Sequence, residues 1–328
     1  MAKVLVAGPI DAAGLALLEA RADADCKLLD EPTAAEIDAR IADIDAIILR
    51  TTPFGADTIA RAGRLRVVSR YGVGYDNVDV AALTARGIPL AIVGDANAVT
   101  VAEITLGLML AVARRLPFYD RDTRAGGFGV RDPREQSDLA GKTVLVVGFG
   151  RVGRQVARRC AAFDMSVVVA DPFVARESVE GEGYRHVADF REALAEADFV
   201  TLHLPGNADG RPELGAAEFA ALKPGAYFVN AARGSLVDED ALVAALASGR
   251  VRGAALDVLR DEPPRPDHPL LRLDNVVLSP HCASMTAECM ERMSVASAQN
   301  VLDALDGTLD PGLVVNAEVL RRSRARGE

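Results

Sequence analysis

Short apolar stretches alternate with amphipathic stretches along the chain, beginning at its first residues. Each apolar stretch is rich in Val, Ile and Leu and only a few residues long, which is typical of buried strands. The longer stretches between them carry apolar positions at helical spacing. Strands that alternate with helices form parallel sheets, so the pattern predicts the α/β class. The expected strands are residues 3–7, 46–49, 66–69, 89–93, 143–147, 166–170, 199–203, 227–230, 253–256 and 275–279.

Two of these strands begin alike, since Val4–Gly8 reads VLVAG and Val144–Gly148 reads VLVVG. The repetition suggests two doubly wound parallel sheets that open in the same way. A length of 328 residues agrees with two domains, because one domain takes roughly 150 residues. A boundary is expected within Asp95–Thr100, where a strand gives way to a long apolar helix. Only the strand that opens the second sheet is followed by the further glycines of a pyrophosphate-binding turn.

The long apolar stretch, Val101–Ala113, carries Glu103 and falls short of the roughly 18 residues that suggest a membrane span. We therefore expect a buried helix. The apolar run that follows Met1 is too short for the core of an export signal. Neither segment predicts a membrane protein.

Composition is ordinary for a globular protein, with 50% hydrophobic and 26% charged residues. The net charge of −10 repels phosphate backbones and anionic lipids, so we expect no nucleic acid and no membrane as partner. A small anionic substrate would need a local basic pocket. The four cysteines lack metal-ligand spacing, which indicates free thiols in a reducing cytoplasm and no metal site.

The sequence Gly148-Phe-Gly150-Arg-Val-Gly153 follows an apolar strand and opens a helical stretch. Its glycines are placed for a tight turn, for close approach of a pyrophosphate and for packing of the helix on the strand. The helix N-terminus would then bind phosphates through its exposed N–H groups. A glycine-rich loop without a ligand is the alternative, but the strand before it and the helix after it favour dinucleotide binding.

Asp171 ends the next expected strand, where a carboxylate can accept hydrogen bonds from the adenosine ribose hydroxyls. The following Pro172-Phe173 offers no cation for a 2′-phosphate. NAD is therefore favoured over NADP, although Arg151 and Arg176 are close in sequence.

Hydride transfer to a ketone places negative charge on the carbonyl oxygen, so a site for it needs a proton donor and a cation. His281 comes just after an expected strand and before an expected helix, at the edge where α/β sites form. His203 lies within an apolar strand and is expected to be a core or cofactor-edge residue. His186 and His268 lie in polar stretches and are expected at the surface.

Two further residues complete this site. Glu262 could pair with His281 and fix its tautomer, the alternative being a loop carboxylate before Pro263. The planar fork of Arg233 could hold a carboxylate with two hydrogen bonds and polarise the carbonyl. Without the other residues, Arg233 would be read as a helix-capping or surface arginine.

Taken together, these stretches resemble the D-2-hydroxyacid dehydrogenase family, and within it the phosphoglycerate dehydrogenase branch. The resemblance covers nearly the whole chain, and several ordered motifs are more specific than any one of them. Its carriers are Arg70–Asp79 (RYGVGYDNVD), Gly148–Gly153 (GFGRVG), Asn230–Gly234 (NAARG), Ala255–Val258 (ALDV) with Glu262-Pro263, and Ser279–His281 (SPH).

The resemblance implies a catalytic set with His281 as acid and base, Glu262 as its partner and Arg233 on the substrate carboxylate and carbonyl. Asp257 would face the nicotinamide. Backbone N–H groups at Gly72, Val73 and Gly74 would bind the substrate, and Arg50 and Arg70 match positions that help hold a substrate phosphate. The implied cofactor contacts are Val73, Gly148, Gly150, Arg151, Val152, Gly153, Asp171, Leu204, Ala231, Ala232, Arg233, Asp257, His281 and Ser284.

The family fold implies a Rossmann cofactor domain inserted into a flavodoxin-like substrate domain, the two closing over the substrate. The expected substrate domain is residues 1–97 completed by a C-terminal helix within 284–328, and the expected cofactor domain is residues 98–283. Family members are usually dimers paired through the cofactor domains, and the apolar 101–113 helix suits such burial. We expect no regulatory domain after Glu328.

The expected function is NAD-dependent hydride transfer on a D-2-hydroxy acid, with 3-phosphoglycerate favoured by Arg50 and Arg70. Reduction of hydroxypyruvate or glyoxylate is the alternative. Tyr71 and Tyr75 weigh against 3-phosphoglycerate, because they are bulkier than the residues common beside this glycine loop. Formate dehydrogenases share this architecture but have glutamine as the partner of the histidine. Glu262 at that position therefore favours a hydroxy acid as substrate. An NAD-sensing corepressor is the alternative from another class, and the acidic balance argues against it.

Overall fold

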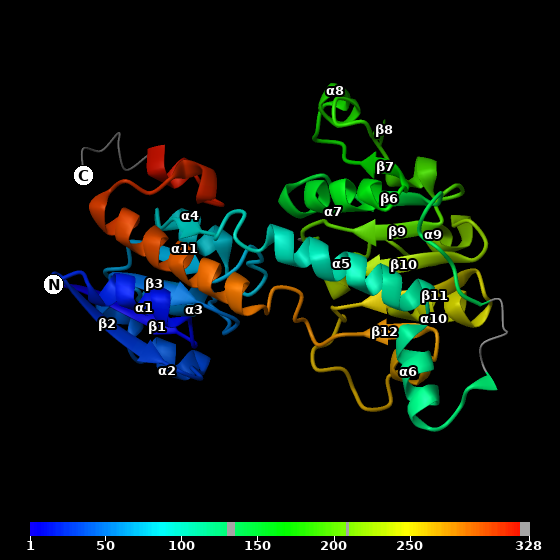
Figure 1. The fold of residues 1–328 in the computed structure, drawn as a ribbon. Coiled ribbons are helices and arrows are strands. Elements are labelled where there is room, and N and C mark those ends of the chain that lie inside the picture. The colour runs from blue at the N-terminus through cyan, green and yellow to red at the C-terminus, as the bar shows by residue number, and fades with distance from the viewer. Residues whose placement is uncertain (130–134, 208–209, 322–328) are drawn as a thin grey trace. The chain divides into compact units, whose positions relative to one another are not determined.

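The computed structural model describes residues 1–129, 135–207 and 210–321. The chain divides into two compact units, each built on one parallel sheet (Figure 1). The first unit is Met1–Asn97 together with the segment that starts at Ser284, and the second is Ala98–Ala283. This arrangement confirms the predicted α/β class with two doubly wound parallel sheets.

The strands are β1 Ala2–Ala7, β2 Ala24–Leu29, β3 Ala46–Leu49, β4 Val67–Arg70, β5 Leu90–Ala91, β6 Thr143–Val147, β7 Ser166–Ala170, β8 Arg185–Val187, β9 Phe199–Leu202, β10 Ala226–Asn230, β11 Val251–Leu256 and β12 Val276–Leu278. The α-helices are α1 Ala12–Glu19, α2 Ala34–Asp38, α3 Ala56–Arg61, α4 Val80–Ala85, α5 Ala98–Ala113, α6 Leu116–Arg124, α7 Arg151–Ala162, α8 Arg176–Glu180, α9 Ala216–Ala221, α10 Glu239–Ala247 and α11 Ala287–Asp306.

The sheet of the first unit has the order β2-β1-β3-β4-β5, which is the flavodoxin-like order. Successive residues of a strand point to opposite faces. Val4 and Val6 of β1 therefore join one apolar core, and Leu5 and Ala7 join the core on the other face. Because both faces are covered by helices, these strands are continuously apolar.

Helix α11 packs against α1 of the same unit, although the two are far apart in sequence (Figure 1). The helices touch closely at Gly14, where a Cβ atom would lie 2.2 Å from Oγ of Ser294. That hydroxyl donates a hydrogen bond to the Asp11 carbonyl at 2.9 Å. Thr286 caps the start of α11, and Gly307, with φ of 76°, ends it.

The sheet of the second unit has the order β12-β11-β10-β9-β6-β7-β8. If strands β6 to β11 are numbered 1 to 6 along the chain, they lie in the order 3-2-1-4-5-6, which is the Rossmann order. Leu145 and Val147 of β6 enter the core on one face, and Val144 and Val146 enter the core on the other. Strand order reverses between β6 and β9, so the carboxyl ends of these two strands flank the crevice where ligands bind in such sheets.

Helix α5 contains the long apolar stretch of the sequence. It packs on α7, β10 and β11 of its own unit, and residues such as Leu106, Met109 and Val112 are buried there. Packing inside the unit therefore accounts for its apolar character. In the described part of the chain, no helix is both long and apolar enough to cross a membrane.

Two strands were not predicted, β2 and β8, and both lie at an edge of their sheet. An edge strand is covered less fully, and the residues of β2 are half-buried or exposed. Their sequences, ADCKLL and RHV, consequently lack the apolar run that marked the central strands. Strand β9 ends at Leu202, which places His203 just beyond the strand in which it was predicted.

Candidate active site

Polar and glycine residues follow the carboxyl ends of the strands in the second unit. Gly148 follows β6, Asp171 follows β7, His203 follows β9, Asp257 follows β11 and Ser279 follows β12, while Asn230 is the last residue of β10. Parallel strands end at the same edge, so all of these residues lie along one edge of the sheet.

The glycine loop after β6 has the three roles that its spacing predicted. Gly148 has φ of 94°, and a Cβ atom there would lie 2.5 Å from the His203 carbonyl oxygen. A Cβ atom at Gly153 would lie 2.0 Å from the Gly148 carbonyl oxygen, so this glycine lets α7 pack on the loop. Gly150 has no atom near its missing Cβ, so the space beside the loop is open at this position, as close approach of a pyrophosphate would require.

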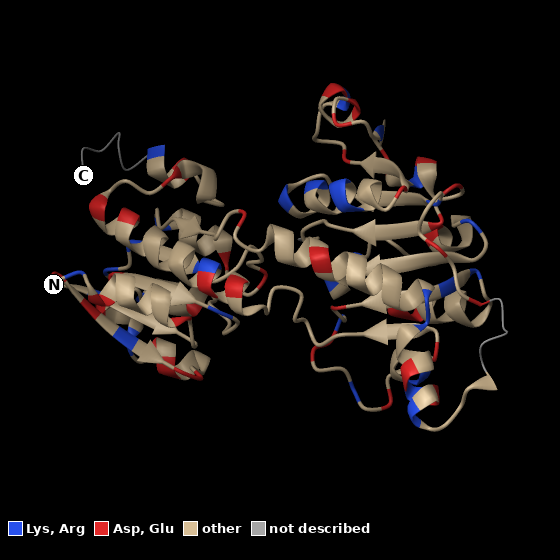
Figure 2. Ribbon diagram, in the orientation of Figure 1, with Lys and Arg blue, Asp and Glu red and all other residues tan. Residues whose placement is uncertain are grey.

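Helix α7 begins directly after Gly150, and no side chain caps its N-terminus. Its first N–H groups are consequently available to an anion. Arginines gather on this helix, as Figure 2 shows, and Arg151 is its first residue. The loop and helix start therefore suit a dinucleotide pyrophosphate, and Val152 packs at the margin of the apolar core below.

The carboxylate of Asp171 braces the glycine loop from the next strand. One oxygen accepts a hydrogen bond from the Phe149 N–H at 2.8 Å, and the other accepts from the Phe173 N–H at 2.9 Å. Each carboxylate oxygen can accept more than one bond, so both can still receive a ribose hydroxyl. Arg176, a candidate partner for a 2′-phosphate, pairs with Glu180 at 3.4 Å.

Two histidines were expected at the surface; His186 is buried, so that prediction was wrong, and His268 is half-buried. His186 is 8% exposed, and its Nε2 lies 2.9 Å from the Asp171 carbonyl oxygen. His268 has a 15% exposed side chain whose Nε2 lies 3.0 Å from Oε2 of Glu239. Both segments are polar in sequence, but each histidine packs against an element that is distant along the chain.

His203 is half-buried beneath the glycine loop. Its Nε2 lies 3.0 Å from the Thr201 hydroxyl, and among the described residues its Nδ1 has no hydrogen-bond partner. Burial lowers the pKa of His203 to about 3. The imidazole is therefore neutral at physiological pH and does not serve as a general acid.

Arg233 lies in the loop after β10, between buried Ala231 and Ala232 on one side and Gly234 on the other. Its guanidinium donates a hydrogen bond to the Ala232 carbonyl at 2.6 Å, which fixes one end of the planar fork. The loop itself is braced by Asn230, whose side chain bonds to the backbone of Ala232 and Arg233.

His281 and Glu262 form a direct pair in the same unit. Nδ1 of His281 lies 2.7 Å from Oε2 of Glu262, and Oε1 of Glu262 accepts from the Leu259 N–H at 3.0 Å. The His281 side chain is 50% exposed, which leaves its Nε2 face accessible. The structure thus brings together two residues that the sequence places well apart.

Asp257 is 1% exposed and occupies the start of the loop after β11. Its carboxylate accepts hydrogen bonds from the Ser279 hydroxyl and from the N–H groups of Cys282 and Ala283. These donors flank His281. Leu204 follows His203 at the same edge and packs partly on the core.

The remaining candidates belong to the first unit. Arg50 donates a hydrogen bond to the Pro9 carbonyl at 2.5 Å, and its guanidinium lies 5.0 Å from the centre of the Tyr71 ring. The Tyr71 hydroxyl donates to the Met290 carbonyl at 3.0 Å, and burial raises the pKa of that phenol. Arg50 is therefore held by a carbonyl and an aromatic face. Ser284 is half-buried where this unit resumes.

Arg70 and the glycine turn follow β4. Arg70 donates to the Tyr71 carbonyl at 2.5 Å. The Gly72 N–H donates to the Arg70 carbonyl at 2.9 Å. Within the described residues, the N–H groups of Val73 and Gly74 make no backbone hydrogen bond.

Sequence reasoning assigned no role to Asn230 and only a cofactor contact to Asp257. Both are polar residues at the ends of apolar strands and are buried to 1% exposure. That position is the signal that could have identified them, because a buried polar group requires hydrogen-bond partners.

The chain is similar in sequence and in fold to known dehydrogenases and reductases. Residues 106–283 match the family model described as D-isomer specific 2-hydroxyacid dehydrogenase, NAD binding domain. The chain is 38% identical over 315 residues to the D-3-phosphoglycerate dehydrogenase of Methanocaldococcus jannaschii, covering 96% of this chain and 59% of that protein. It is 37% identical over 324 residues to the glyoxylate reductase of Korarchaeum cryptofilum, covering 97% of each.

The chain thus spans less than two thirds of the phosphoglycerate dehydrogenase that it matches. Among solved structures, the TT0316 protein from Thermus thermophilus is similar, with a TM-score of 0.85 and 35% identity over 95% of this chain and 99% of that one. A glyoxylate reductase from Paecilomyes thermophila has a TM-score of 0.86 and 31% identity, covering 96% of this chain and 98% of that one.

Proposed function

The chain belongs to the D-isomer specific 2-hydroxyacid dehydrogenase family, and from this premise we propose that it is an NAD-dependent oxidoreductase acting on a D-2-hydroxy acid and its 2-oxo acid. The observation that carries the proposal is the His281–Glu262 pair, which lies in the same unit as the glycine loop and Arg233. A proton donor, a carboxylate-binding cation and a dinucleotide loop are the parts that hydride transfer to a 2-oxo acid requires.

The residues at the carboxyl edge fit NAD. Open space at Gly150, the uncapped start of α7 and the Asp171 carboxylate suit the pyrophosphate and the adenosine ribose. When bound, the cofactor supplies the hydride for reduction or takes it up in oxidation. We propose Val73, Leu204, Ala231, Ala232 and Ser284 as further contacts.

In the proposed mechanism, Arg233 binds the substrate carboxylate and polarises the neighbouring carbonyl. The carbonyl carbon receives the hydride while protonated His281 donates its proton to the carbonyl oxygen, which yields the hydroxy acid. Glu262 accepts the hydrogen bond from Nδ1–H of His281 and so turns Nε2 toward the substrate. In the oxidative direction, neutral His281 takes the hydroxyl proton.

The preferred substrate pair in this proposal is 3-phosphoglycerate and 3-phosphohydroxypyruvate. Arg50 and Arg70 would hold the phosphate. The contacts of Arg50 with the Pro9 carbonyl and the Tyr71 ring involve neutral groups, so they do not neutralise the positive charge of its guanidinium. Reduction of hydroxypyruvate or glyoxylate is the second candidate. It is supported by the Korarchaeum cryptofilum glyoxylate reductase, which this chain matches over almost its full length.

A panel of substrates tests the proposal. NADH oxidation by the purified protein is followed with phosphohydroxypyruvate, hydroxypyruvate, glyoxylate and pyruvate in parallel. Preference for the phosphorylated acid, lost in Arg50→Gln, supports the first candidate, whereas preference for an unphosphorylated acid supports the second. NADH binding without turnover of any of these acids would contradict the enzymatic proposal and support an NAD-sensing binding protein.

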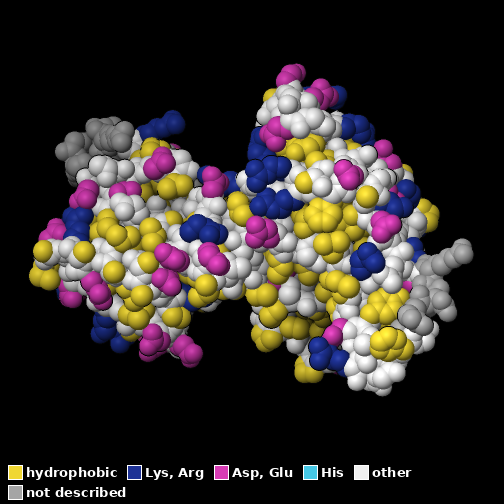
Figure 3. Space-filling view, viewed as in Figure 1, with side chains coloured by type: hydrophobic (Ala, Val, Ile, Leu, Met, Phe, Trp, Pro, Cys, Tyr) yellow, Lys and Arg dark blue, Asp and Glu magenta, His cyan; other side chains and the backbone are white. Residues whose placement is uncertain are grey.

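We also propose that the chain forms a homodimer through the second unit. A hollow of about 470 Å³ lies between α6, the amino end of β11 and the whole of β12, whereas His281, Glu262 and Arg233 lie in loops that follow strands. Figure 3 shows apolar side chains gathered over this face, and Leu116 and Leu271 are 52% and 41% exposed. Such an exposed apolar patch is typical of an interface.

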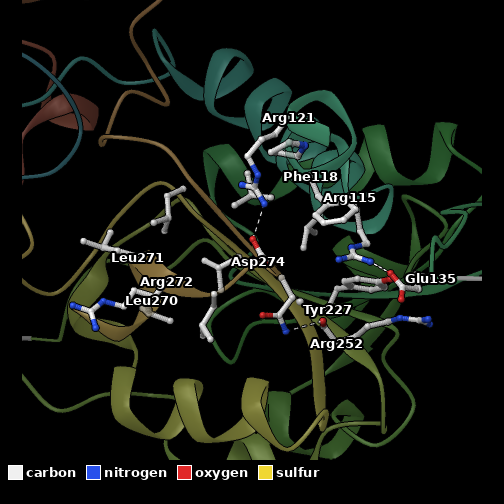
Figure 4. Close-up of a pocket in the computed structure, with 18 residues that line it drawn as sticks. Arg115, Phe118, Arg121, Glu135, Tyr227, Arg252, Leu270, Leu271, Arg272 and Asp274 are labelled. Atoms are coloured by element: carbon white, nitrogen blue, oxygen red, sulfur yellow. Dashed lines mark hydrogen bonds and ion pairs between the residues drawn. The ribbon is translucent and has the colours of Figure 1, made fainter. Parts of the chain in front are cut away.

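The charges around the hollow suit a second copy of the same surface. The Arg121 guanidinium lies 2.6 Å from Asp274, and Arg115 pairs with Glu135, both beside the Phe118 ring (Figure 4). Alternating signs allow a two-fold contact to be complementary to itself. Leu271→Glu should convert a dimer to a monomer in light scattering, and a monomeric unmodified protein would contradict the proposal.

We place this activity in the cytoplasm. Cys26, Cys160, Cys282 and Cys289 are all free thiols in the structure, as a reducing compartment allows.

A further inference from the structure

We infer that Asn230 and Asp257 are positioning residues that hold the loops of Arg233 and His281 in a fixed relation to each other. The inference rests on the proposed function, because it concerns the groups assigned to that chemistry. Asn230 ends β10 and Asp257 follows β11, and these two strands are neighbours in the sheet. Neither side chain is more than 1% exposed.

Asn230 fixes the loop that carries Arg233. Its Oδ1 accepts a hydrogen bond from the Ala232 N–H at 3.0 Å, and its Nδ2 donates to the Arg233 carbonyl at 2.8 Å. One amide side chain thereby satisfies a donor and an acceptor of the same turn. The backbone of Arg233 is thus held by the Asn230 side chain, and its guanidinium is held by the Ala232 carbonyl.

Asp257 fixes the loop that carries His281. Its Oδ1 accepts from the Ser279 hydroxyl at 2.6 Å and from the Cys282 N–H at 3.0 Å, and its Oδ2 accepts from the Ala283 N–H at 2.9 Å. Its own carbonyl accepts from the His281 N–H at 2.7 Å. These four bonds enclose the catalytic histidine on both sides.

The backbone of His281 shows why such a hold is needed. Its φ is 50°, in the left-handed region that residues with a side chain rarely adopt. A conformation of this kind persists when its surroundings over-determine it. The bonds to Asp257 supply that constraint, and they keep the imidazole directed to Glu262.

The two loops are also joined to each other. The Asp257 N–H donates to the Asn230 carbonyl at 2.9 Å. Gly234, directly after Arg233, packs so closely on the Leu259 carbonyl group that a Cβ atom would lie 2.0 Å from its carbon. The N–H of Leu259 in turn donates to Glu262. A displacement at either strand end therefore reaches both Arg233 and the His281–Glu262 pair.

A cofactor contact is the competing role for Asp257, and the two roles predict different measurements. A contact to the nicotinamide would make NADH binding depend on Asp257. A positioning role would leave the dissociation constant of NADH unchanged and lower turnover, because a misplacement of about 1 Å can cost about 100-fold in rate.

The test uses two variants that keep side-chain size. Asp257→Asn replaces an accepting oxygen by a donating NH2 group, and Asn230→Asp replaces a donating NH2 group by an accepting oxygen. Asp198→Asn is the matched control, since Asp198 also accepts from a backbone N–H, that of Thr143, but precedes β9 at the opposite edge of the sheet. Each variant is compared with the unmodified protein by amide hydrogen exchange, NADH fluorescence titration, and kcat and KM with the preferred oxo acid.

For Asp257→Asn we expect faster exchange across residues 279–283 and a fall in kcat of about 10- to 100-fold, with unchanged NADH affinity. Asn230→Asp should speed exchange in both loops and raise KM for the oxo acid, because Arg233 binds its carboxylate. Asp198→Asn should change neither kcat nor KM. Ser279→Ala, which removes one of the bonds to Asp257, should have the same effect as Asp257→Asn but a smaller one.

Exchange at residues 279–283 that stays slow in Asp257→Asn would overturn the inference, as would kcat retained despite faster exchange. A loss of NADH affinity with unchanged exchange would assign Asp257 to the cofactor instead. The exchange measurement needs no activity. If the unmodified protein turned over no oxo acid, the proposed function would fail while the loop contacts were still decided by exchange.

Discussion

Nδ1 of His281 lies 2.7 Å from Oε2 of Glu262, and the other oxygen of the same carboxylate accepts from the Leu259 N–H. The carboxylate is thus fixed to its own loop at one end and to the imidazole at the other. The two side chains are 50% and 37% exposed, and an exposed pair contributes only about 0–1 kcal/mol to stability. Orientation of the imidazole is therefore the principal effect of this pair.

Replacing His281 tests the acid directly. His281→Ala should lower kcat about 10²- to 10⁴-fold, which is the usual contribution of a positioned proton donor. The free energy of unfolding should change by less than about 0.5 kcal/mol, because the side chain is exposed. Steady-state kinetics and urea unfolding give the two values.

Glu262→Gln keeps the shape of the partner and removes its charge. We expect a smaller loss of kcat than in His281→Ala. Near-normal turnover in His281→Ala, with the same pH dependence as the unmodified protein, would show that another group supplies the proton.

Gly150 and Gly153 should respond in opposite ways to alanine. Gly153→Ala forces a Cβ atom to 2.0 Å from the Gly148 carbonyl, and overpacking of this kind destabilises by about 1–3 kcal/mol. Gly150→Ala meets no neighbouring atom, so the protein should fold normally.

The methyl group of Gly150→Ala would instead occupy the space for the pyrophosphate. Loss of one hydrogen bond to a charged group, about 1.5–3 kcal/mol, should weaken NADH binding about 10-fold or more. Thermal unfolding and fluorescence titration separate the two variants. Equal NADH affinity in Gly150→Ala and the unmodified protein would place the pyrophosphate elsewhere.

Asp171 should favour NADH over NADPH. A 2′-phosphate beside this carboxylate would meet like charge, which costs about 1–4 kcal/mol at contact distance near a protein surface. The dissociation constant for NADPH should therefore exceed that for NADH by about 10-fold or more. Asp171→Asn should narrow the ratio, and a lower KM for NADPH than for NADH in the unmodified protein would refute the preference.

His203 should make the protein sensitive to acid. Its pKa is about 3 in the folded state against 6.5 for an unburied histidine, because burial disfavours the charged ring. Between these two values the unfolded chain binds a proton at His203 that the folded chain does not bind. The free energy of unfolding is therefore unaffected by protonation of His203 above pH 6.5. It declines by about 1.4 kcal/mol per pH unit as the pH falls toward 3.

His203→Gln removes this proton while keeping a polar group near Thr201. Urea unfolding from pH 8 to pH 4 should show a shallower loss of stability in His203→Gln than in the unmodified protein. Parallel curves for the two proteins would mean that His203 is protonated in the folded state.

Much of this protein was readable in its sequence because the relevant preferences are local. The three glycines of the loop after β6 each have a role that depends on neighbours a few residues away, and their spacing predicted the turn, the open space and the helix packing. Central strands such as β6 and β7 were predicted because both of their faces are buried. Their apolar runs report that burial directly.

Other features required the tertiary structure. His186 and His268 lie in polar segments, and their burial depends on Asp171 and Glu239, which are distant in sequence. Edge strands β2 and β8 are recognised by their pairing rather than by their residues. A polar pattern cannot reveal which distant element will cover it.

The amino-acid sequence by itself determined the α/β class, the dinucleotide loop and the types of residue available for chemistry. Only the tertiary structure decided that Asn230 and Asp257 meet at neighbouring strand ends. It also decided between the predicted pairing of Glu262 with His281 and a loop carboxylate without that pairing. The physical reason is that a residue's conformational preference is set by its chain neighbours, whereas a hydrogen bond between loops depends on the order of strands in the sheet. That order is set by packing across the whole unit.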